Sequence, residues 1–234
     1  MDRKQVETYR LSLFGRMAMG VAHEMDNHLS VVIGFSEIIQ ISASNPQKVQ
    51  DSAGKVLSAG ERITELIKQY SQYVRPHAPE REHFAPGEMF ADLLLFSRYD
   101  LGRGGAVVEL PPSWPPGLIR ADRRDFGLAA LSLLFNAAEA MTERGGSISI
   151  GALRNEEGWE ITVSDKGPGI PAGSEEKVFE EGFTTRTETF RTGMGLPVAR
   201  SLVAEAGGTL RLENAAGGGC VATIRLPAER RKQA

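Results

Sequence analysis

The chain has 234 residues, of which 41% are hydrophobic and 24% charged, a composition that is ordinary for a globular protein. Its formal net charge of −3 gives no overall attraction to nucleic acid, and the basic residues within 230–234 are expected to form a solvated tail. No apolar run approaches the roughly 18 residues that a membrane-spanning helix needs, and no signal-peptide core follows the first residues. We therefore expect a cytoplasmic protein with no membrane segment in this chain.

Apolar positions in residues 1–75 recur in alternating steps of four and three, the pattern of helices in a coiled-coil-like bundle. One series is Phe14, Ala18, Val21, Met25, His28, Val32, Phe35 and Ile39, and the next is Val49, Ala53, Val56, Gly60, Ile63, Ile67, Tyr70 and Val74. Asn45 and Pro46 between them predict a turn with a helix cap. Such a hairpin cannot bury both seams alone, so we expect a homodimer with a four-helix bundle.

The pattern stops at Arg75-Pro76-His77-Ala78-Pro79, which predicts a linker over 76–83. Residues 84–229 mix helical stretches (86–97, 123–142 and 196–206) with alternating strands (147–153, 159–165, 209–213 and 221–226). This order predicts an α+β domain with helices over one face of a mixed sheet. The single cysteine, Cys220, lies in the last strand and is expected to be a buried, inert thiol.

Four histidines are present, and helix geometry separates them. His77 and His83 lie near the linker and are expected to be solvated. His28 falls on the seam and is expected to pack in the bundle. His23 points away from the seam, with Asn27 one turn later on the same face and Glu24 as its neighbour.

Residues Gly20-Val21-Ala22-His23-Glu24-Met25-Asp26-Asn27 resemble the phosphoacceptor box of sensor histidine kinases. The resemblance implies that His23 is the nucleophile toward the γ-phosphate of ATP, that Glu24 orients the imidazole, and that Asn27 positions water in a later phosphatase reaction. A neutral imidazole is a competent nucleophile at pH 7, and a carboxylate can set its tautomer. His28 stands where many members have proline, which predicts a straighter helix.

Three further segments resemble the nucleotide-binding boxes of this family. Leu133–Ala140 resembles the asparagine box, which implies that Asn136 binds the Mg²⁺ bridging the phosphates. Asp165-Lys166-Gly167-Pro168-Gly169-Ile170 follows a strand, and its likeness implies that Asp165 accepts a hydrogen bond from adenine while Gly167, Gly169 and Ile170 allow close approach. Gly193-Met194-Gly195-Leu196 opens a helix whose N-terminus would face phosphate.

Between these boxes, Val178–Arg186 resembles the family's phenylalanine box in the variant that ends Thr-Thr-Lys, here Thr184, Thr185 and Arg186. This variant points to the nitrogen-regulation-like subclass. About two dozen residues between Ile170 and Gly193 would form the lid over ATP. Arg186 could contact the phosphates or be an exposed lid arginine.

The resemblance of these boxes to those of the family, in the same order and spacing, implies a two-component autokinase: a helical hairpin followed by an α+β sandwich ATP-binding domain of the histidine kinase and gyrase type. It would use ATP and Mg²⁺, phosphorylate His23, pass the phosphate to an aspartate of a response regulator receiver domain, and dephosphorylate that partner. No sensor segment precedes the first helix, so we expect the input from a separate sensor protein or from outside this chain.

Three alternatives share part of this pattern. Gyrase-like ATPases carry a water-activating glutamate four residues before the metal-binding asparagine, where this chain has Ser132, so rapid hydrolysis is disfavoured. Histidine kinases usually have asparagine at that position, so Ser132 also weakens the predicted metal site. A histidine phosphotransfer protein with a non-catalytic ATP domain is the main alternative, although such proteins lose the boxes kept here. A serine kinase of the anti-sigma type would have no use for the His23 hairpin.

Overall fold

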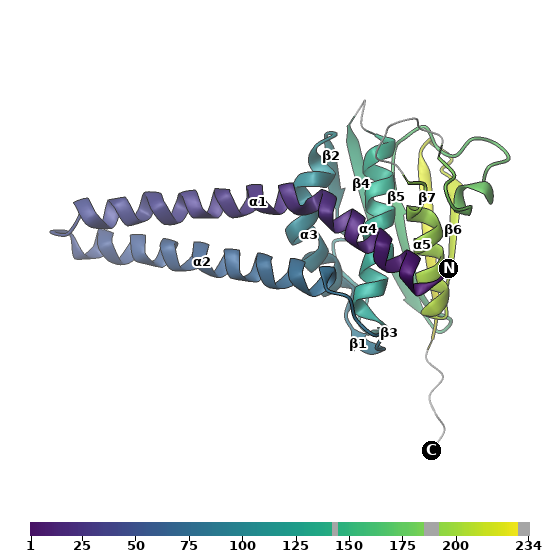
Figure 1. The fold of residues 1–234 in the computed structure, drawn as a ribbon, viewed down its shortest axis with the longest axis horizontal. Coiled ribbons are helices and arrows are strands. Elements are labelled where there is room, and N and C mark those ends of the chain that lie inside the picture. The colour runs from purple at the N-terminus through teal and green to yellow at the C-terminus, as the bar shows by residue number, and fades with distance from the viewer. Residues whose placement is uncertain (142–144, 185–191, 229–234) are drawn as a thin grey trace, which may run out of the picture.

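The computed structural model describes residues 1–141, 145–184 and 192–228 (Figure 1). Two long helices, α1 (Arg3–Ile41) and α2 (Pro46–Val74), form a hairpin that extends from one side of an α/β body (Figure 1). The predicted turn is confirmed, because the Asn45 side chain accepts a hydrogen bond from the Lys48 amide at 3.1 Å and Pro46 begins the second helix. In the described part of the chain, no helix is both long and apolar enough to cross a membrane.

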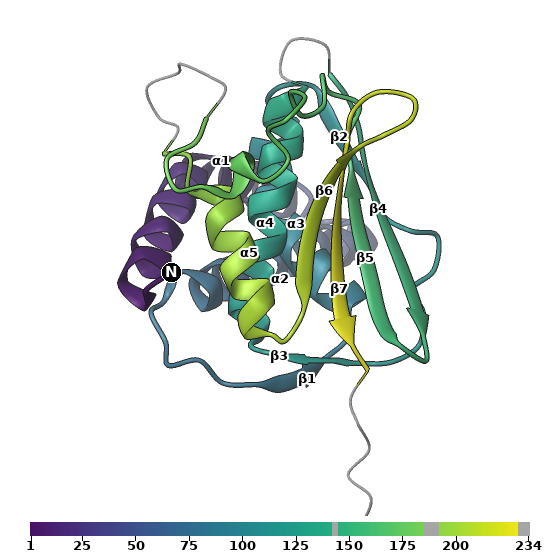
Figure 2. The same cartoon turned by 90° about the vertical axis from the view of Figure 1, so that its right-hand side faces the viewer.

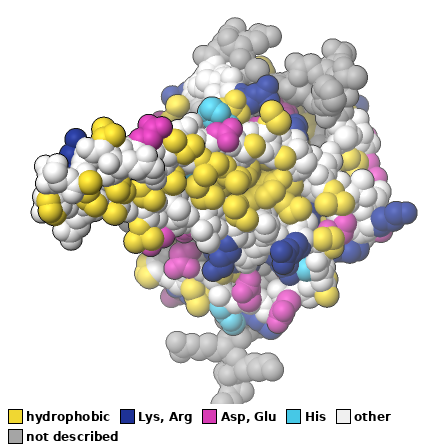
Figure 3. All heavy atoms as spheres, turned by 60° about the vertical axis from the view of Figure 1, so that its left-hand side comes forward, with side chains coloured by type: hydrophobic (Ala, Val, Ile, Leu, Met, Phe, Trp, Pro, Cys, Tyr) yellow, Lys and Arg dark blue, Asp and Glu magenta, His cyan; other side chains and the backbone are white. Residues whose placement is uncertain are grey.

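The hairpin buries one face of each helix within the single chain. On α2 the buried positions recur every seven residues: Ser52, Ala59, Leu66 and Tyr73. They lie beside the predicted seam and do not coincide with it, since the seam residue Ile67 is 43% exposed. A continuous apolar surface therefore remains along the outside of the hairpin (Figure 3).

The body contains a five-stranded sheet in the order β2-β4-β5-β7-β6, in which only β2 and β4 are parallel. Its strands are β2 (Ala106–Glu109), β4 (Gly146–Asn155), β5 (Gly158–Ser164), β6 (Thr209–Asn214) and β7 (Cys220–Pro227). A short antiparallel pair, β1 (Glu82–Phe84) and β3 (Ile119–Ala121), lies apart from this sheet. The four strands predicted from alternation are present, whereas β1, β2 and β3 were not predicted.

Three helices, α3 (Pro86–Gly102), α4 (Arg123–Ala140) and α5 (Gly195–Glu205), cover one face of the sheet, and a short 3₁₀ helix spans Lys177–Phe179 (Figure 2). This confirms the predicted α+β arrangement. Helix α4 is buried on almost every side, from Asp125 to Phe135, as expected of a central helix that is apolar all round. Asp122 caps it by accepting a hydrogen bond from the Asp125 amide at 2.9 Å.

The first turns of α1 pack on this body and not on α2 alone. Their buried residues are Val6, Arg10, Leu13, Phe14, Met17, Gly20 and Val21. Figure 2 shows this part of α1 beside α5, on the side of the helical layer away from the sheet. Gly20 allows the closest approach, since a Cβ atom there would overlap Asp100 and Tyr99 of α3. A single helix thus joins the hairpin to the α/β body.

Candidate functional site

A cavity of about 760 Å³ opens between α4, the loop after β5, the turn before α5 and the first turns of α1. It brings together residues from all three predicted nucleotide boxes. Those lining it are Asn136, Asp165, Gly169, Ile170, Gly193, Met194, Gly195 and Leu196, together with Thr184 from the lid segment. These groups are far apart in sequence, so the fold alone gathers them.

Asp165 forms the floor of the cavity at the end of β5 and is only 6% exposed. Its Oδ1 accepts hydrogen bonds from the Gly167 amide at 2.8 Å and the Cys220 amide at 3.2 Å. A Cβ atom on Gly167 would lie 2.8 Å from the Ala140 side chain, so only glycine leaves this turn open. The carboxylate is therefore fixed in place with space in front of it.

Asn214 of β6 holds the loop that follows. Its Oδ1 accepts from the Ile170 amide at 2.6 Å, and its Nδ2 donates to the Ile170 carbonyl at 2.9 Å. Gly169 has φ +79°, and a Cβ atom there would contact the Asn214 side chain. Gly169 thus allows the positive φ and the close approach of Asn214 that this loop requires. Asn214 is a supporting residue that sequence reasoning missed.

Asn136 is exposed on α4 and faces the cavity, although its neighbours along the helix are buried. Its amide oxygen is a ligand type suited to Mg²⁺, so the residue fits the predicted metal role. Glu139 lies one turn later and pairs with Arg16 of α1 at 2.9 Å. Ser132, one turn earlier, is buried and donates to the Leu128 carbonyl at 2.8 Å.

The glycine turn before α5 forms the opposite wall. Gly193 has φ +62° and accepts a hydrogen bond from the Gly182 amide at 3.2 Å, which ties the turn to the lid segment. No side chain caps the N-terminus of α5 in the described chain. Backbone N–H groups at such an end form a ready site for phosphate.

The remaining lid residues are only partly described. Thr184 is exposed and lines the cavity. Thr185 and Arg186, which were also named as nucleotide-binding residues of the lid, lie outside the described residues.

The predicted acceptor group lies elsewhere on α1. His23 and Asn27 are exposed and Glu24 is half-buried, so the outward orientation of His23 is as predicted. The His23 ring packs on Tyr99 of α3 with a centroid distance of 4.6 Å. None of these three residues is among the described residues that line the cavity.

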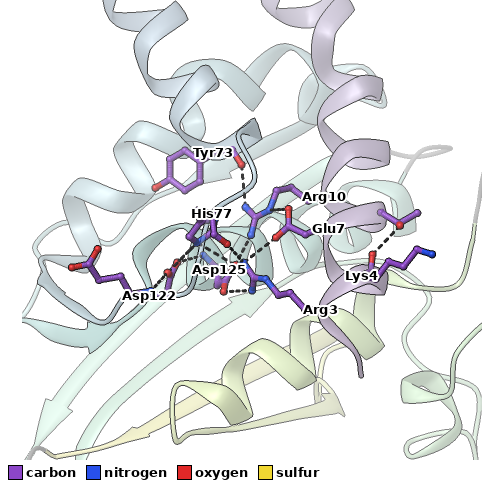
Figure 4. A network of polar contacts seen from close by, with 10 residues as sticks. Arg3, Lys4, Glu7, Arg10, Tyr73, His77, Asp122 and Asp125 are labelled. Carbon is purple, nitrogen blue, oxygen red and sulfur yellow. Dashed lines mark hydrogen bonds and ion pairs between the residues drawn. The ribbon is translucent and has the colours of Figure 1, made fainter.

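A buried polar cluster joins the hairpin to the body below the cavity (Figure 4). The Arg10 guanidinium is fully buried, donates to the Tyr73 carbonyl at 3.0 Å and pairs with Asp125 of α4. Arg3 binds the same carboxylate at 2.5 Å. Both arginines also pair with Glu7, so two guanidinium groups face two carboxylates that the helical layer has largely removed from water.

His77 belongs to this cluster, which corrects the prediction that it is solvated. Its side chain is only 5% exposed, and its Nε2 lies 3.0 Å from both carboxylate oxygens of Asp122. Burial would raise the pKa of Asp122, but hydrogen bonds from the Glu80 and Asp125 amides and from His77 lower it below its usual value. Ligand atoms of Glu7, His77 and Asp125 lie within 4.8 Å of one another, and Arg3 and Arg10 already pair with both carboxylates.

Cys220 is buried as predicted. Burial and the neighbouring Asp165 raise the pKa of its thiol to about 12, so it is protonated and unreactive at neutral pH.

The main residues of the cavity that sequence reasoning missed are Tyr9, Leu13 and Arg16 of α1. A signal for them exists, since Val6, Arg10, Leu13, Met17 and Gly20 recur in steps of four and three, but the arginine interrupts its apolar character.

Comparisons with known proteins agree with this geometry. Residues 121–230 match the model of the family described as histidine kinase-, DNA gyrase B- and HSP90-like ATPase. The signal transduction histidine-protein kinase AtoS of Escherichia coli (strain K12) is 27% identical over 229 residues, which cover 97% of this chain and 37% of that protein. The chain spans about a third to a half of the length of the curated relatives it resembles.

Solved structures give the same fold. A mycobacterial sensor histidine kinase, MprB, aligns with a TM-score of 0.52 and 27% identity over 65% of this chain and 97% of that one. Histidine kinase ThkA, in a crystal structure with response regulator protein TrrA, aligns with a TM-score of 0.56 and 24% identity over 97% of this chain and 65% of that one. The second region of the chain therefore has the ATP-binding α/β sandwich fold of this ATPase family, and the relatives support a histidine kinase catalytic core.

Proposed function

We propose that this chain binds Mg²⁺-ATP in the cavity and transfers the γ-phosphoryl group to His23, as a protein histidine kinase of a two-component system. The observation that carries the proposal is the convergence of Asn136, Asp165 and the Gly193–Leu196 turn on one cavity. Each is a modest signal in sequence. Together they provide one group for Mg²⁺, one for the adenine ring and one for the phosphates of a nucleotide.

Each group has a distinct task. Asp165, held by two backbone amides, presents a fixed carboxylate that can accept a hydrogen bond from the amino group of adenine. The uncapped N-terminus of α5 offers N–H donors and a positive helix end to the phosphates. Mg²⁺ held by Asn136 would offset the charge that phosphate oxygens carry during transfer.

The cavity favours transfer to a protein nucleophile over hydrolysis. Ser132 stands where a carboxylate base would be needed, and its hydroxyl is already bonded to the Leu128 carbonyl. Glu139 is an acidic residue of α4 that lines the cavity, but it pairs with Arg16. The exposed imidazole of His23 is a nucleophile at neutral pH, and Glu24 on the same helix turn would orient it.

We further propose that two copies assemble through the hairpin. Apolar side chains cover one face of it (Figure 3), and the large exposed hydrophobic residues of the hairpin include Leu29, Ile33, Leu57 and Ile67. A stripe of this kind on a bundle helix is typical of a face that packs against another helix pair. Light scattering on the purified chain should give the mass of a dimer, and Ile33→Glu should give a monomer.

The acceptor assignment is tested by incubating the chain with γ-labelled ATP and Mg²⁺. We expect label that is stable to base and labile to acid, and its loss in His23→Gln. His28→Gln, one turn further on the same helix, is the matched control and should retain labelling. Label that survives His23→Gln would refute the assignment to His23, and a wild-type chain that binds no ATP at millimolar Mg²⁺ would favour a phosphotransfer protein.

Transfer onward is a separate step. We propose a response regulator receiver domain as the partner, with its aspartate taking the phosphoryl group from His23. Asn27, exposed one turn after His23, would position water for dephosphorylation of that aspartate. Asn27→Ala should therefore reduce phosphatase activity on the partner while labelling of His23 persists.

A further inference from the structure

The first turns of α1 form one wall of the nucleotide cavity. Tyr9, Ser12, Leu13 and Arg16 share one face of the helix and line the same space as Asn136 of α4. The tyrosine, the serine and the arginine end in O–H or N–H donors, which are the groups that phosphate oxygens accept hydrogen bonds from. The hairpin thus brings polar donors to the nucleotide site.

The charged side chains that line the cavity balance one another. Among the described residues of its lining, Arg16 and Arg103 are cationic and Glu139 and Asp165 are acidic. The phosphates of ATP add several negative charges, of which Mg²⁺ offsets only a part. Arginine is the side chain best suited to the remainder, because its planar guanidinium donates to phosphate oxygens in pairs. An arginine beside the metal position would therefore supply the missing positive charge.

Arg16 lies at that position. Its Nη1 is 2.9 Å from Oε1 of Glu139, and its guanidinium carbon lies 4.9 Å from the centre of the Phe135 ring. These two residues flank Asn136 on α4, since Phe135 precedes it directly and Glu139 follows one turn later, about 5–6 Å away between Cβ atoms. The Arg16 side chain is 39% exposed and lines the cavity, so a ligand bound there can reach it.

The pairing with Glu139 leaves Arg16 available. Both side chains are partly exposed, so water screens their attraction, and such pairs contribute little to stability. The phosphates next to a metal at Asn136 carry more negative charge than one carboxylate, and their attraction for the guanidinium is correspondingly stronger. Exchange of the carboxylate for a phosphate is therefore favourable.

We propose that Arg16 is a ligand of the nucleotide phosphates, which it binds in exchange for Glu139, so that the hairpin supplies part of the ATP site. This rests on the proposed function. Arg16 precedes His23 by seven residues, which is two turns and about 10 Å along one face of the same helix. The helix that carries the acceptor histidine thus contacts the donor nucleotide, and the positions of the two are linked.

The first test measures the dissociation constant of a non-hydrolysable ATP analogue with Mg²⁺ by calorimetry. Arg16→Met removes the charge and keeps most of the side-chain volume, and it should bind about ten- to a hundredfold more weakly, the range of a charged hydrogen bond. Arg16→Lys keeps the charge but loses the paired donors, so its affinity should lie between those of wild type and Arg16→Met. Arg62→Met is the control and should match wild type, because Arg62 is 61% exposed on α2 and is not among the described residues that line the cavity.

A double variant separates a phosphate ligand from a counter-ion. In Arg16→Met, Glu139 loses this arginine, and its charge would itself repel phosphate. Arg16→Met/Glu139→Gln removes both charges and keeps the net charge of the cavity, yet it should remain weak, because no guanidinium is left at this position. Wild-type affinity in the double variant would show that Arg16 only neutralises Glu139, and would overturn the proposal. Glu139→Gln alone should bind at least as tightly as wild type, and weaker binding would contradict the exchange.

Adenosine separates phosphate recognition from damage to the pocket. It carries the base but no phosphate, so its affinity, measured by competition, should be the same in Arg16→Met and wild type. Equal weakening of adenosine and the ATP analogue would give Arg16 a structural role and overturn the proposal, as would unchanged binding of the analogue. If Asn136→Ala still abolished binding in that last case, the nucleotide site would stand without Arg16. A wild-type chain that bound no nucleotide would instead refute the site itself, and the role of Arg16 with it.

Discussion

Replacing Arg10 by methionine tests whether the buried polar cluster stabilises the docked arrangement. The guanidinium is fully buried, and its loss leaves the Tyr73 carbonyl without its side-chain donor and Asp125 with Arg3 as its remaining arginine partner. Breaking a buried ion pair by removing one partner costs about 3–5 kcal/mol, because the other charge stays desolvated. Methionine keeps most of the side-chain volume, so lost packing contributes little to this figure.

The matched control is Arg16→Met on the same helix. Arg16 is 39% exposed and its partner Glu139 is 26% exposed, so water screens this pair and its loss should cost about 1 kcal/mol or less. The two variants remove the same charge within two helical turns, from a buried site in Arg10→Met and from a partly exposed site in Arg16→Met.

Urea unfolding followed by tryptophan fluorescence and by circular dichroism gives the two free energies. For a chain of this size each kcal/mol corresponds to roughly 2–4 °C in the thermal midpoint, so Arg10→Met should melt about 6–20 °C below wild type. Equal losses in Arg10→Met and Arg16→Met would refute the reasoning, because burial would then not decide the cost.

Three further changes test other features of the fold. Gly54→Ala, in the interior of α2 where an added Cβ meets nothing within 4 Å, should raise the free energy of unfolding by about 0.5–1 kcal/mol; a decrease would mean that this face is covered. Gly173→Ala, at φ +76° in open space, should lower the free energy of unfolding only by backbone strain of about 1–3 kcal/mol. Gly158→Ala, at φ +138°, should lower it more, because the added Cβ would also overlap a backbone carbonyl of strand β7. The midpoints of urea unfolding rank the two variants. Because the pKa of Asp122 is lowered in the folded state, its carboxylate stabilises the fold fully above the unfolded pKa near 4, and this stability is lost as pH falls through the lower folded pKa. Asp122→Asn should therefore flatten the dependence of the urea midpoint on pH below about 4. An unchanged slope would contradict this.

The sequence predicted elements whose patterns are long and locally determined. The regular spacing in the first helix of the hairpin, from Phe14 to Ile39, extends over about seven turns, and the hairpin turn depends on Asn45 and Pro46, which act within three residues. Strands β4 to β7 alternate over at least six residues each. By contrast β1 and β3 have three residues each, which is too short for any periodicity, and they form only because Glu82 and Ala121 meet across the chain.

The residues of the predicted boxes that line the cavity could be picked out because they lie in motifs, but their neighbours could not. Asn214 holds the cavity loop through hydrogen bonds to Ile170, 44 residues earlier, and Tyr9 lines the cavity together with Gly195, 186 residues later. His77 was predicted to be solvated because its surroundings in sequence are polar and rich in proline. Its burial depends on Asp122, 45 residues later, and no local pattern predicts such a contact.

Helix α1 is a single rod of 39 residues, about 58 Å long, whose first turns touch the nucleotide cavity and whose middle carries His23. A rod of this kind transmits torsion. A turn of about 30° about its axis would move a side-chain tip at a radius of about 6 Å by roughly 3 Å, which is the length of a hydrogen bond. A twist applied to this helix would therefore shift Tyr9 at the cavity and re-aim the His23 imidazole in one motion, without any change in secondary structure.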